Sequence, residues 1–339
     1  MKKIRFAIVG TSKIAAQVVS AGRQDMRFEA VAVCSRSRER AAEFARENDI
    51  PHTFTSVCEM AESPLIDAVY IATPNSTHAE LSIYCMSRGK HVLCEKPLAS
   101  NAREAGRMIE AAQRYGVVLM EAMITTLNPN FLLMKQHLKD LGTVRRYFAS
   151  YCQYSSRYDA FKEGTVLNAF KPELSNGAVM DIGIYTIYPL VALFGRPRQI
   201  EAQGILLSTG VDGQGAVNFR YDDMNATVLY SKIADSLLPA EIEGEDGTLL
   251  LDRIQIPRRV ELHLRKERTT RCISRPLEKS EYYYEVAEFI DLIEQGRRES
   301  ELNSHTHSLV TMEIIDEVRR QLGVHYPADD ETTIYNPLY

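Results

Sequence analysis

The sequence predicts an α/β fold, in which a doubly wound parallel β-sheet is followed by an α+β domain. Short apolar segments without polar alternation, such as Ile4–Val9 and Asp67–Ala72, alternate with helical segments up to residue 122. Strands that are apolar on both faces are typical of a parallel sheet covered by helices, and repeated βα units produce double winding. Beyond residue 122, strand-like segments are separated by turns such as Asp246-Gly247, which indicates antiparallel hairpins.

The first domain is predicted to span residues 1–122. Gly89 and Gly116 follow helical segments and are typical helix ends. The expected strands are Ile4–Val9, Phe28–Cys34, Asp67–Ala72, His91–Cys94 and Val117–Met120, and the expected helices are Ile14–Val19, Arg38–Glu47, Ser76–Arg88 and Ala102–Arg114.

The second domain is predicted to span residues 123–339 and to provide substrate binding and oligomerisation. It should contain helices at Asn130–Leu141, Tyr284–Glu294 and Thr306–Leu322. The expected strands are Arg145–Tyr154, Ile200–Leu207, Gly215–Tyr221, Ala226–Ile233, Pro239–Glu243, Thr248–Leu251 and Val260–Leu264. A mainly antiparallel sheet covered by helices on one face leaves its other face open, so we expect a homodimer or homotetramer.

Composition excludes several classes of function. Apolar residues make up 45% and charged residues 25% of the 339 residues, as in ordinary globular proteins, and the net charge of −5 argues against nucleic-acid binding. No apolar run reads as a signal peptide or a membrane span, and the six cysteines are scattered without metal-ligand spacing. We therefore expect a cytoplasmic protein that binds no membrane and no metal.

The turn after the first strand has features of a dinucleotide-binding site, as in a Rossmann domain. Gly10 allows a tight turn, Ser12 is small where backbone would meet pyrophosphate, and Ala15 is small where the helix packs on the strand. Because two of the three usual glycines are absent, a plain strand-to-helix turn is the alternative. The residues predicted to hold the pyrophosphate are Gly10, Thr11, Ser12, Lys13 and Ile14.

The end of the second strand favours NADP(H) over NAD(H). No acidic residue stands at positions 34–38 to hold a ribose hydroxyl, whereas Ser35, Arg36 and Arg40 can contact a 2′-phosphate. A solvated basic helix start is the alternative, but Arg at a helix N-terminus opposes the helix dipole unless an anion is present.

Two further loops follow parallel strands and should line the cofactor, because ligands bind beyond the carboxyl ends of such strands. In the first, the predicted cofactor-binding residues are Ala72, Thr73, Pro74, Asn75 and His78. In the second, Glu95 and Lys96 precede Pro97. A Lys there can stabilise an alkoxide or a phenolate, although on this motif alone a surface lysine paired with Glu95 is the better interpretation.

The segment from Asn176 to Tyr185 supplies the other candidate catalytic groups. If it is helical, Asp181 and Tyr185 lie four residues apart on one face, and Gly183 allows another backbone to approach closely. A phenol has a pKa near 10, so Tyr185 needs a neighbouring cation such as Lys96 to work as an acid or base at neutral pH. An ordinary amphipathic helix with a buried Tyr is the alternative.

Taken together, five motifs resemble those of the glucose-fructose oxidoreductase/inositol dehydrogenase (Gfo/Idh/MocA) family. They are Gly10–Ala15, Ala72–His78, Glu95-Lys96-Pro97, Met120-Glu121-Ala122 and Asp181–Tyr185. The resemblance implies that Lys96 is the active-site lysine. Tyr185, where many members carry His, is more similar to the branch of dihydrodiol and D-xylose dehydrogenases, which favour NADP. Ser12 and Ser175-Asn176-Gly177 depart from the family's usual glycines.

The expected reaction is hydride transfer between nicotinamide and a secondary alcohol or carbonyl of a sugar, polyol or cyclic diol. Tyr185 would move the proton, Lys96 would stabilise the charge, and Asp181 would organise the pair. Two alternatives remain open: a redox-assisted, NAD-dependent glycosidase, and a dinucleotide-binding regulator without turnover.

Overall fold

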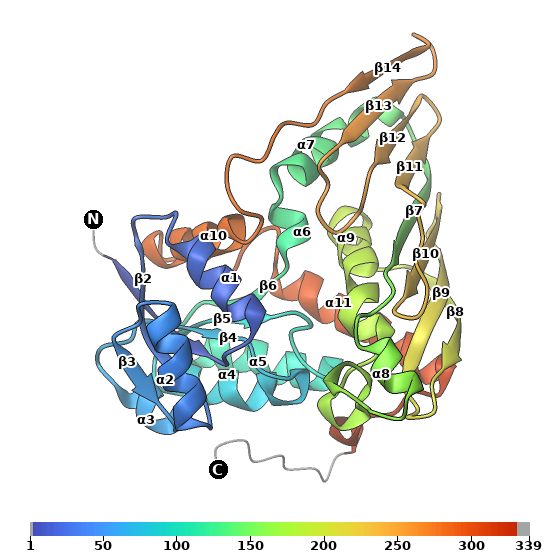
Figure 1. Cartoon of the computed structure of the whole chain (residues 1–339). Helices are drawn as coiled ribbons and strands as arrows, with labels where there is room; N and C mark the ends of the chain where they lie inside the picture. Colours follow the sequence, from blue (N-terminus) through green and yellow to red (C-terminus); the bar gives the residue numbers. More distant parts are fainter. Residues whose placement is uncertain (1–2, 331–339) are drawn as a thin grey trace. The chain divides into compact units, whose positions relative to one another are not determined.

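The structure, a computed structural model, describes residues 3–330 (Figure 1). The chain forms two compact units. The first contains residues up to Met123 together with Lys279–Leu309, and the second contains Ile124–Glu278 and Val310–Asp329. The return of the chain to the first unit over Lys279–Leu309 was not part of the predicted division into 1–122 and 123–339, and residues 331–339 of that division lie outside the described residues.

A six-stranded parallel sheet forms the centre of the first unit. Its strand order is β3-β2-β1-β4-β5-β6, and every pair of neighbours is parallel. The strands are β1 (Ile4–Val9), β2 (Phe28–Cys34), β3 (His52–Phe54), β4 (Ala68–Ile71), β5 (His91–Glu95) and β6 (Leu119–Ala122). This order reverses between β1 and β4, and in such sheets a ligand crevice lies beyond the carboxyl ends of the two strands at the reversal.

Helices cover both faces of this sheet. In Figure 1, α1 and α10 lie on one face and α4 and α5 on the other. The helices are α1 (Lys13–Gly22), α2 (Arg38–Glu47), α3 (Val57–Glu62), α4 (His78–Ser87), α5 (Ala102–Tyr115) and α10 (Tyr283–Glu294). Phe6 of β1 packs against Phe28 and Phe289, with ring centroids 4.7 and 5.8 Å apart, which anchors α10 to the sheet. The predicted doubly wound parallel sheet is confirmed.

The second unit contains an eight-stranded sheet with the order β14-β13-β12-β11-β7-β10-β9-β8. Its strands are β7 (Val144–Cys152), β8 (Gln199–Leu206), β9 (Asp212–Arg220), β10 (Asn225–Ser231), β11 (Ala240–Gly244), β12 (Gly247–Leu251), β13 (Val260–Leu264) and β14 (Thr269–Cys272). All neighbours are antiparallel except β7 and β10, which are parallel. The expected mainly antiparallel sheet is confirmed, and β14, which no sequence pattern indicated, extends its edge.

Helices of the second unit pack on one face of this sheet. The helices of this unit are α6 (Ile124–Leu127), α7 (Pro129–His137), α8 (Tyr158–Lys162) and α9 (Ile184–Phe194), and α11 (His305–Leu322) continues into this unit from the first. α9 contacts β7 and β10, and the Phe194 ring meets Tyr147 edge-on at 6.2 Å. The inward side chains Tyr147, Val217 and Val228 are fully buried, which places the core between α9 and the sheet.

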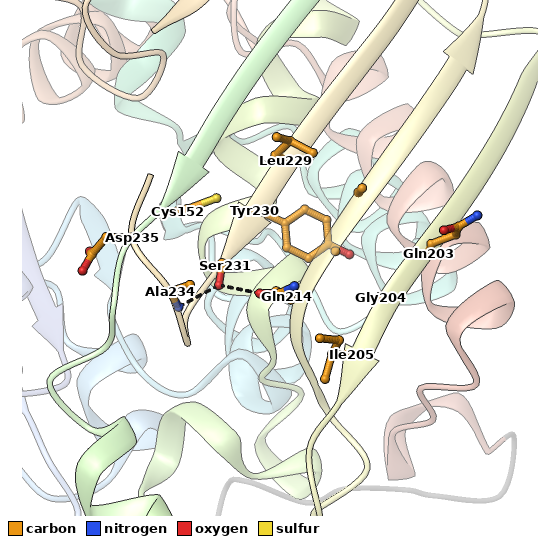
Figure 2. A pocket seen from close by; sticks show the side chains of 12 residues that line it. Cys152, Gln203, Gly204, Ile205, Gln214, Leu229, Tyr230, Ser231, Ala234 and Asp235 are labelled. Atoms are coloured by element: carbon orange, nitrogen blue, oxygen red, sulfur yellow. Dashed lines mark hydrogen bonds between the residues drawn. The ribbon is translucent and has the colours of Figure 1, made fainter. Parts of the chain in front are cut away.

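The opposite face of this sheet carries no helix among residues 3–330. It is hollowed over β8, β9 and β10 by a depression of about 390 Å³, which Figure 2 shows. Ile205, Gln203, Gln214 and Leu229 line the depression, and Ser231 Oγ donates to Gln214 Oε1 at 3.4 Å. The open face predicted from the strand pattern is therefore present.

One apolar stretch differs from the expectation. Within residues 3–330, only Pro172–Phe194 is long and apolar enough to cross a membrane by length and composition, with a mean hydropathy of 1.6. The expectation that no such run exists was wrong. Its apolarity has another explanation, since 72% of its most apolar window is buried inside the protein, as in the core helix of a globular domain.

Candidate functional site

The turn between β1 and α1 forms an exposed cradle of amide groups in the first unit. Gly10 has φ of +106°, and a Cβ there would lie 2.5 Å from the Ala72 carbonyl oxygen, so only glycine fits. Ser12 is the N-cap of α1 and accepts from Ala15 N at 3.1 Å. The amides of Thr11, Ser12, Lys13 and Ile14 donate to no acceptor among the described residues. Such amides at a helix start are suited to bind phosphate oxygens.

The second predicted contact lies after β2. Ser37 is the N-cap of α2 and accepts from Arg40 N at 3.2 Å. Ser35 is half-buried and Arg36 is exposed, and no hydrogen bond or ion pair holds the Arg36 guanidinium within residues 3–330. A cation without a partner at this strand end remains available to an anionic group.

The loop after β4 is ordered by its own side chains and by His78. Thr77 Oγ1 donates within this loop, and its partners are Thr73 Oγ1 at 2.7 Å and the Pro74 carbonyl at 2.8 Å. The fully buried His78 ring places Nε2 3.0 Å from the Thr73 carbonyl and Nδ1 2.9 Å from the Pro97 carbonyl. Burial lowers the pKa of this imidazole. A ring with no exposed surface reaches a cofactor only through these two loops, so His78 positions them.

The segment that carries Lys96 is held from several sides. Pro97 and Leu98 are buried, and the Leu98 amide donates to Glu121 Oε1 at 2.9 Å. Glu121 is itself 2% exposed, and burial raises the pKa of its carboxyl to about 7. Lys96 remains half-exposed at the end of β5. Fixed backbone on both sides of one partly exposed lysine is the arrangement that a catalytic cation requires.

Two acidic residues lie close together here, the half-buried Glu95 and the fully buried Glu285. Tyr70 donates its phenol hydrogen to Glu95, and Glu285 of α10 lies close enough for its charge to act on both residues. Glu285 is 0% exposed, and neither of its carboxyl oxygens has a hydrogen-bond partner in the part of the chain that the structure describes. Burial, with the charge of Glu95 second, raises the pKa of Glu285 well above its usual range. The buried site therefore disfavours the ionised form of Glu285.

In the second unit, a buried carboxylate holds the start of the segment that carries Asp181 and Tyr185. Asp212 accepts from Ala178 N at 3.0 Å and Val179 N at 2.7 Å. Burial raises the pKa of Asp212 to about 6, although these two amides oppose the shift. A Cβ on Gly177 would overlap Asp212 Oδ1, so the carboxylate can approach only because residue 177 is glycine.

The segment is helical but irregular. Val179–Gly183 forms a π-helical turn that leads into α9, so Asp181 lies in the π turn and Tyr185 in the first turn of α9. π turns occur often at functional sites because they redirect side chains out of the regular helical spacing. Gly183 faces the Tyr230 ring, whose Cδ1 would lie 3.1 Å from an added Cβ. The predicted close approach at Gly183 is thus to a side chain and not to a backbone.

Sequence reasoning missed two residues that contact this pair. Lys232, directly after β10, forms an ion pair with Asp181, and the Tyr151 ring meets Tyr185 edge-on with centroids 5.7 Å apart. Lys232 is 5% exposed. A lysine near the end of the apolar segment Ala226–Ile233 is a visible signal, because Lys is almost never buried without a partner.

Comparison with known proteins assigns the chain to a family. Residues 4–123 match the Gfo/Idh/MocA oxidoreductase family, described as an NAD-binding Rossmann fold, and residues 131–250 match the Gfo/Idh/MocA C-terminal domain. The chain belongs to the Gfo/Idh/MocA family of oxidoreductases. The resemblance predicted from the five sequence motifs is confirmed, and so is the assignment as an oxidoreductase with a nicotinamide-cofactor domain.

Several members of the Gfo/Idh/MocA family are similar over nearly the whole chain. Scyllo-inositol 2-dehydrogenase (NADP(+)) IolU of Bacillus subtilis is 53% identical, over 96% of this chain and 99% of that protein. Trans-1,2-dihydrobenzene-1,2-diol dehydrogenase of Danio rerio is 34% identical, over 89% of this chain and 91% of that protein. The crystal structure of aldose-aldose oxidoreductase from Caulobacter crescentus superposes with a TM-score of 0.85, at 19% identity over 95% and 98% of the two chains, which supports the shared fold.

The predicted site residues thus fall into two groups within this Gfo/Idh/MocA chain. The candidate cofactor residues and Lys96 belong to the first unit, on the loops after β1, β2, β4 and β5. Asp181 and Tyr185 belong to the second unit, where Lys232 and Tyr151 contact them. Among residues 3–330, no group of three or more potential metal ligands is present.

The Glu285 carboxyl predicts a pH-dependent stability. Because its pKa in the folded protein is raised above the unfolded value of about 4.3, the native state loses stability as pH rises above that value. Glu285→Gln should remove this penalty. It should leave stability near pH 4, below the unfolded pKa of about 4.3, almost unchanged and raise it by about 1–3 kcal/mol at pH 8.

Denaturant unfolding at the two pH values measures this difference. Glu110→Gln, which changes an exposed carboxyl of α5 in the same unit, is the matched control and should behave like the wild type. An equal effect of Glu285→Gln at both pH values would show that its carboxyl does not resist ionisation.

Proposed function

We propose that this protein is an NADP(H)-dependent dehydrogenase that oxidises a secondary hydroxyl group of a cyclic polyol, with inositols as the first substrates to test. The observation that carries the proposal is the 53% identity, over nearly the full length of both chains, to a scyllo-inositol 2-dehydrogenase (NADP(+)). The candidate groups on both units fit this reaction. Sugars and cyclic diols remain alternative substrates of the same class.

The cofactor assignment is supported by donors that lack partners. The unpartnered amides of Thr11–Ile14 would hold the pyrophosphate, and Arg36, with Ser35 and Arg40 near it, would hold the 2′-phosphate. Two loops would line the nicotinamide end of the cofactor. They contain the residues Ala72, Thr73, Pro74 and Asn75 after β4, and Glu95 and Lys96 at the end of β5. The His78 ring would hold both loops in place through its contacts with the Thr73 and Pro97 carbonyls. When bound, the cofactor accepts the hydride that leaves the carbinol carbon.

The proton chemistry is assigned to Lys96, Tyr185 and Asp181. As the carbon–oxygen double bond of the product forms, the hydroxyl proton of the substrate passes to Tyr185. A phenol accepts a proton near neutral pH only where a cation favours its phenolate form, and Lys96 is the cation that the sequence motifs predict for this role. Asp181 accepts a hydrogen bond and orients the reacting hydroxyl group. Reduction of the carbonyl follows the same steps in reverse.

A cytoplasmic location is part of the proposal. All six cysteines are free, and four are far from reactive: burial raises the pKa of Cys34 and Cys85 to about 12, and the pKa values of Cys94 and Cys152 are also raised by burial. Free cysteines that serve as small apolar residues are usual in a reducing compartment.

Activity with both cofactors tests the function. Purified enzyme should oxidise scyllo- or myo-inositol with NADP⁺, with weaker use of NAD⁺, when nicotinamide absorbance is followed. Arg36→Ala should weaken NADP(H) binding by about 1–3 kcal/mol, the scale of a lost charge-assisted contact, and leave NAD(H) binding nearly unchanged.

Equal weakening of both cofactors in Arg36→Ala would mean that this guanidinium does not hold the 2′-phosphate. Glycoside cleavage without net cofactor consumption would favour the redox-assisted glycosidase instead. Tight dinucleotide binding without turnover on any sugar, polyol or cyclic diol would favour a regulator.

The proton chemistry predicts a non-additive pair of variants. Tyr185→Phe should lower kcat by about 10²–10⁴, because a positioned proton acceptor is lost, while cofactor affinity survives. Lys96→Met should also lower kcat, and the double variant should be little worse than the poorer single one. In the wild type, kcat should depend on a group that titrates below the free tyrosine value, and this limb should move in Lys96→Met. Near-normal kcat in Tyr185→Phe would reassign the proton.

A homodimer or homotetramer built on the open face of the eight-stranded sheet is also proposed. Support comes from the exposed apolar side chain of Ile205, which lines the depression together with Leu229 and the polar side chains of Gln203 and Gln214, since such mixed faces are typical of interfaces. Light scattering should give at least twice the chain mass of 38.4 kDa. Ile205→Glu should shift the mass toward that of the monomer, whereas Met26→Glu, at an exposed site of the first unit, should not.

A further inference from the structure

We propose that Lys232 is a positioning residue for catalysis, which holds the Asp181 carboxylate in one orientation so that it can receive a hydrogen bond from the substrate hydroxyl. The inference rests on the proposed function. It starts from a buried cation that no predicted role explains. Lys232 follows β10 directly, and its side chain is 6% exposed.

The backbone of Lys232 is held by hydrogen bonds on both sides. Its amide donates to the Gly213 carbonyl at 2.8 Å, and its carbonyl accepts from the Ser155 amide at 2.9 Å. Residue 232 is therefore tied both to β9 and to the segment after β7. The ammonium group lies 5.9 Å from the centroid of the Phe170 ring, whose face provides a favourable surface for a cation.

Within residues 3–330, Asp181 is the only hydrogen-bond acceptor that the Lys232 ammonium group reaches. Removing a cation from water is unfavourable, and here one carboxylate compensates that loss. The two partners are unequally buried, since the Asp181 side chain is 34% exposed and that of Lys232 only 6%. The Asp181 carboxylate is therefore partly exposed at the surface of the second unit, and the ammonium group of Lys232 that pairs with it is buried.

This arrangement has a chemical consequence for Asp181. A neighbouring positive charge favours the ionised carboxylate, which is a stronger hydrogen-bond acceptor than a carboxylic acid. Asp181 stands in the π turn immediately before the helix that carries Tyr185, and the Tyr151 ring packs against the Tyr185 ring. An acceptor held rigidly next to the proton-accepting phenol would keep a hydroxyl group oriented for transfer, and small misplacements of such groups are costly.

The ion pair can be tested without any assay of activity. Asp181→Asn should lower the Tm, because it leaves the buried ammonium group of Lys232 without a counter-charge. The double variant Asp181→Asn with Lys232→Met should recover most of that loss. Additive changes in Tm would mean that the two side chains are not paired, and would overturn the proposal.

The positioning role is tested by kinetics at saturating NADP⁺ on the best substrate of the wild type. Lys232→Met should lower kcat by about 10- to 100-fold, leave the KM for NADP⁺ unchanged, and lower the rate of Asp181→Asn no further in the double variant. Lys232→Arg, which keeps the charge, should restore part of the rate. Lys90→Met is the matched control: it removes another buried lysine, bound to the Ser63 and Ile66 carbonyls of the first unit, and should keep the wild-type kcat.

The outcomes separate this inference from the function on which it rests. A kcat of Lys232→Met within twofold of the wild type, or no gain from Lys232→Arg, overturns the positioning role while the dehydrogenase assignment stands. A wild type that oxidises no sugar, polyol or cyclic diol overturns the proposed function and the positioning role together, and the Tm comparison then still reports whether the ion pair exists.

Discussion

The second unit depends on one buried carboxylate. Asp212 accepts hydrogen bonds from the amides of Ala178 and Val179, which begin the helical segment with Asp181 and Tyr185. Around this contact, the Tyr326 phenol donates to the Asn176 carbonyl at 3.0 Å, and the Arg319 guanidinium lies 4.3 Å from the Tyr326 ring. A helix start inside a protein exposes amides that need acceptors, and Asp212 supplies them. The candidate catalytic groups are therefore placed from the core outwards.

In the first unit, the segment around Lys96 is also held by hydrogen bonds to buried polar side chains. The Pro97 carbonyl faces the buried His78 ring, the Leu98 amide is bound by Glu121, and Tyr70 donates to Glu95. Each of these partners is buried, so water does not compete for the hydrogen bonds. A surface lysine paired with Glu95 was the simplest alternative from sequence. The buried polar shell around residues 95–98 instead fits a loop whose geometry is functionally constrained.

Sequence patterns were most informative where one physical cause dominates. The apolar strands of the first unit and the glycines after its helices predicted the parallel sheet, because burial on both faces leaves no room for polar alternation. Short or exposed elements escaped, among them β3, α8 and β14. All four residues of β14, Thr269–Cys272, are exposed. The strand therefore has no buried apolar face, and no alternation of apolar and polar residues predicts it. The π turn at Val179–Gly183 also escaped, since an α-helix and a π turn share the same residue preferences.

By itself, the sequence determined the order of the βα units, the glycine at the first turn, the missing acid after the second strand, and the presence of Lys96, Asp181 and Tyr185. These features follow from local backbone geometry and from side-chain chemistry, and residues close together in the sequence determine both. Only the tertiary structure decided that Lys232 pairs with Asp181, that Asp212 begins the helix of Tyr185, and that Glu285 is buried beside Glu95. These interactions join residues that are 33 to 190 positions apart, counting 212 − 179 for Asp212 and Val179 and 285 − 95 for the two glutamates. No local pattern encodes such pairs, because chain folding alone brings them together.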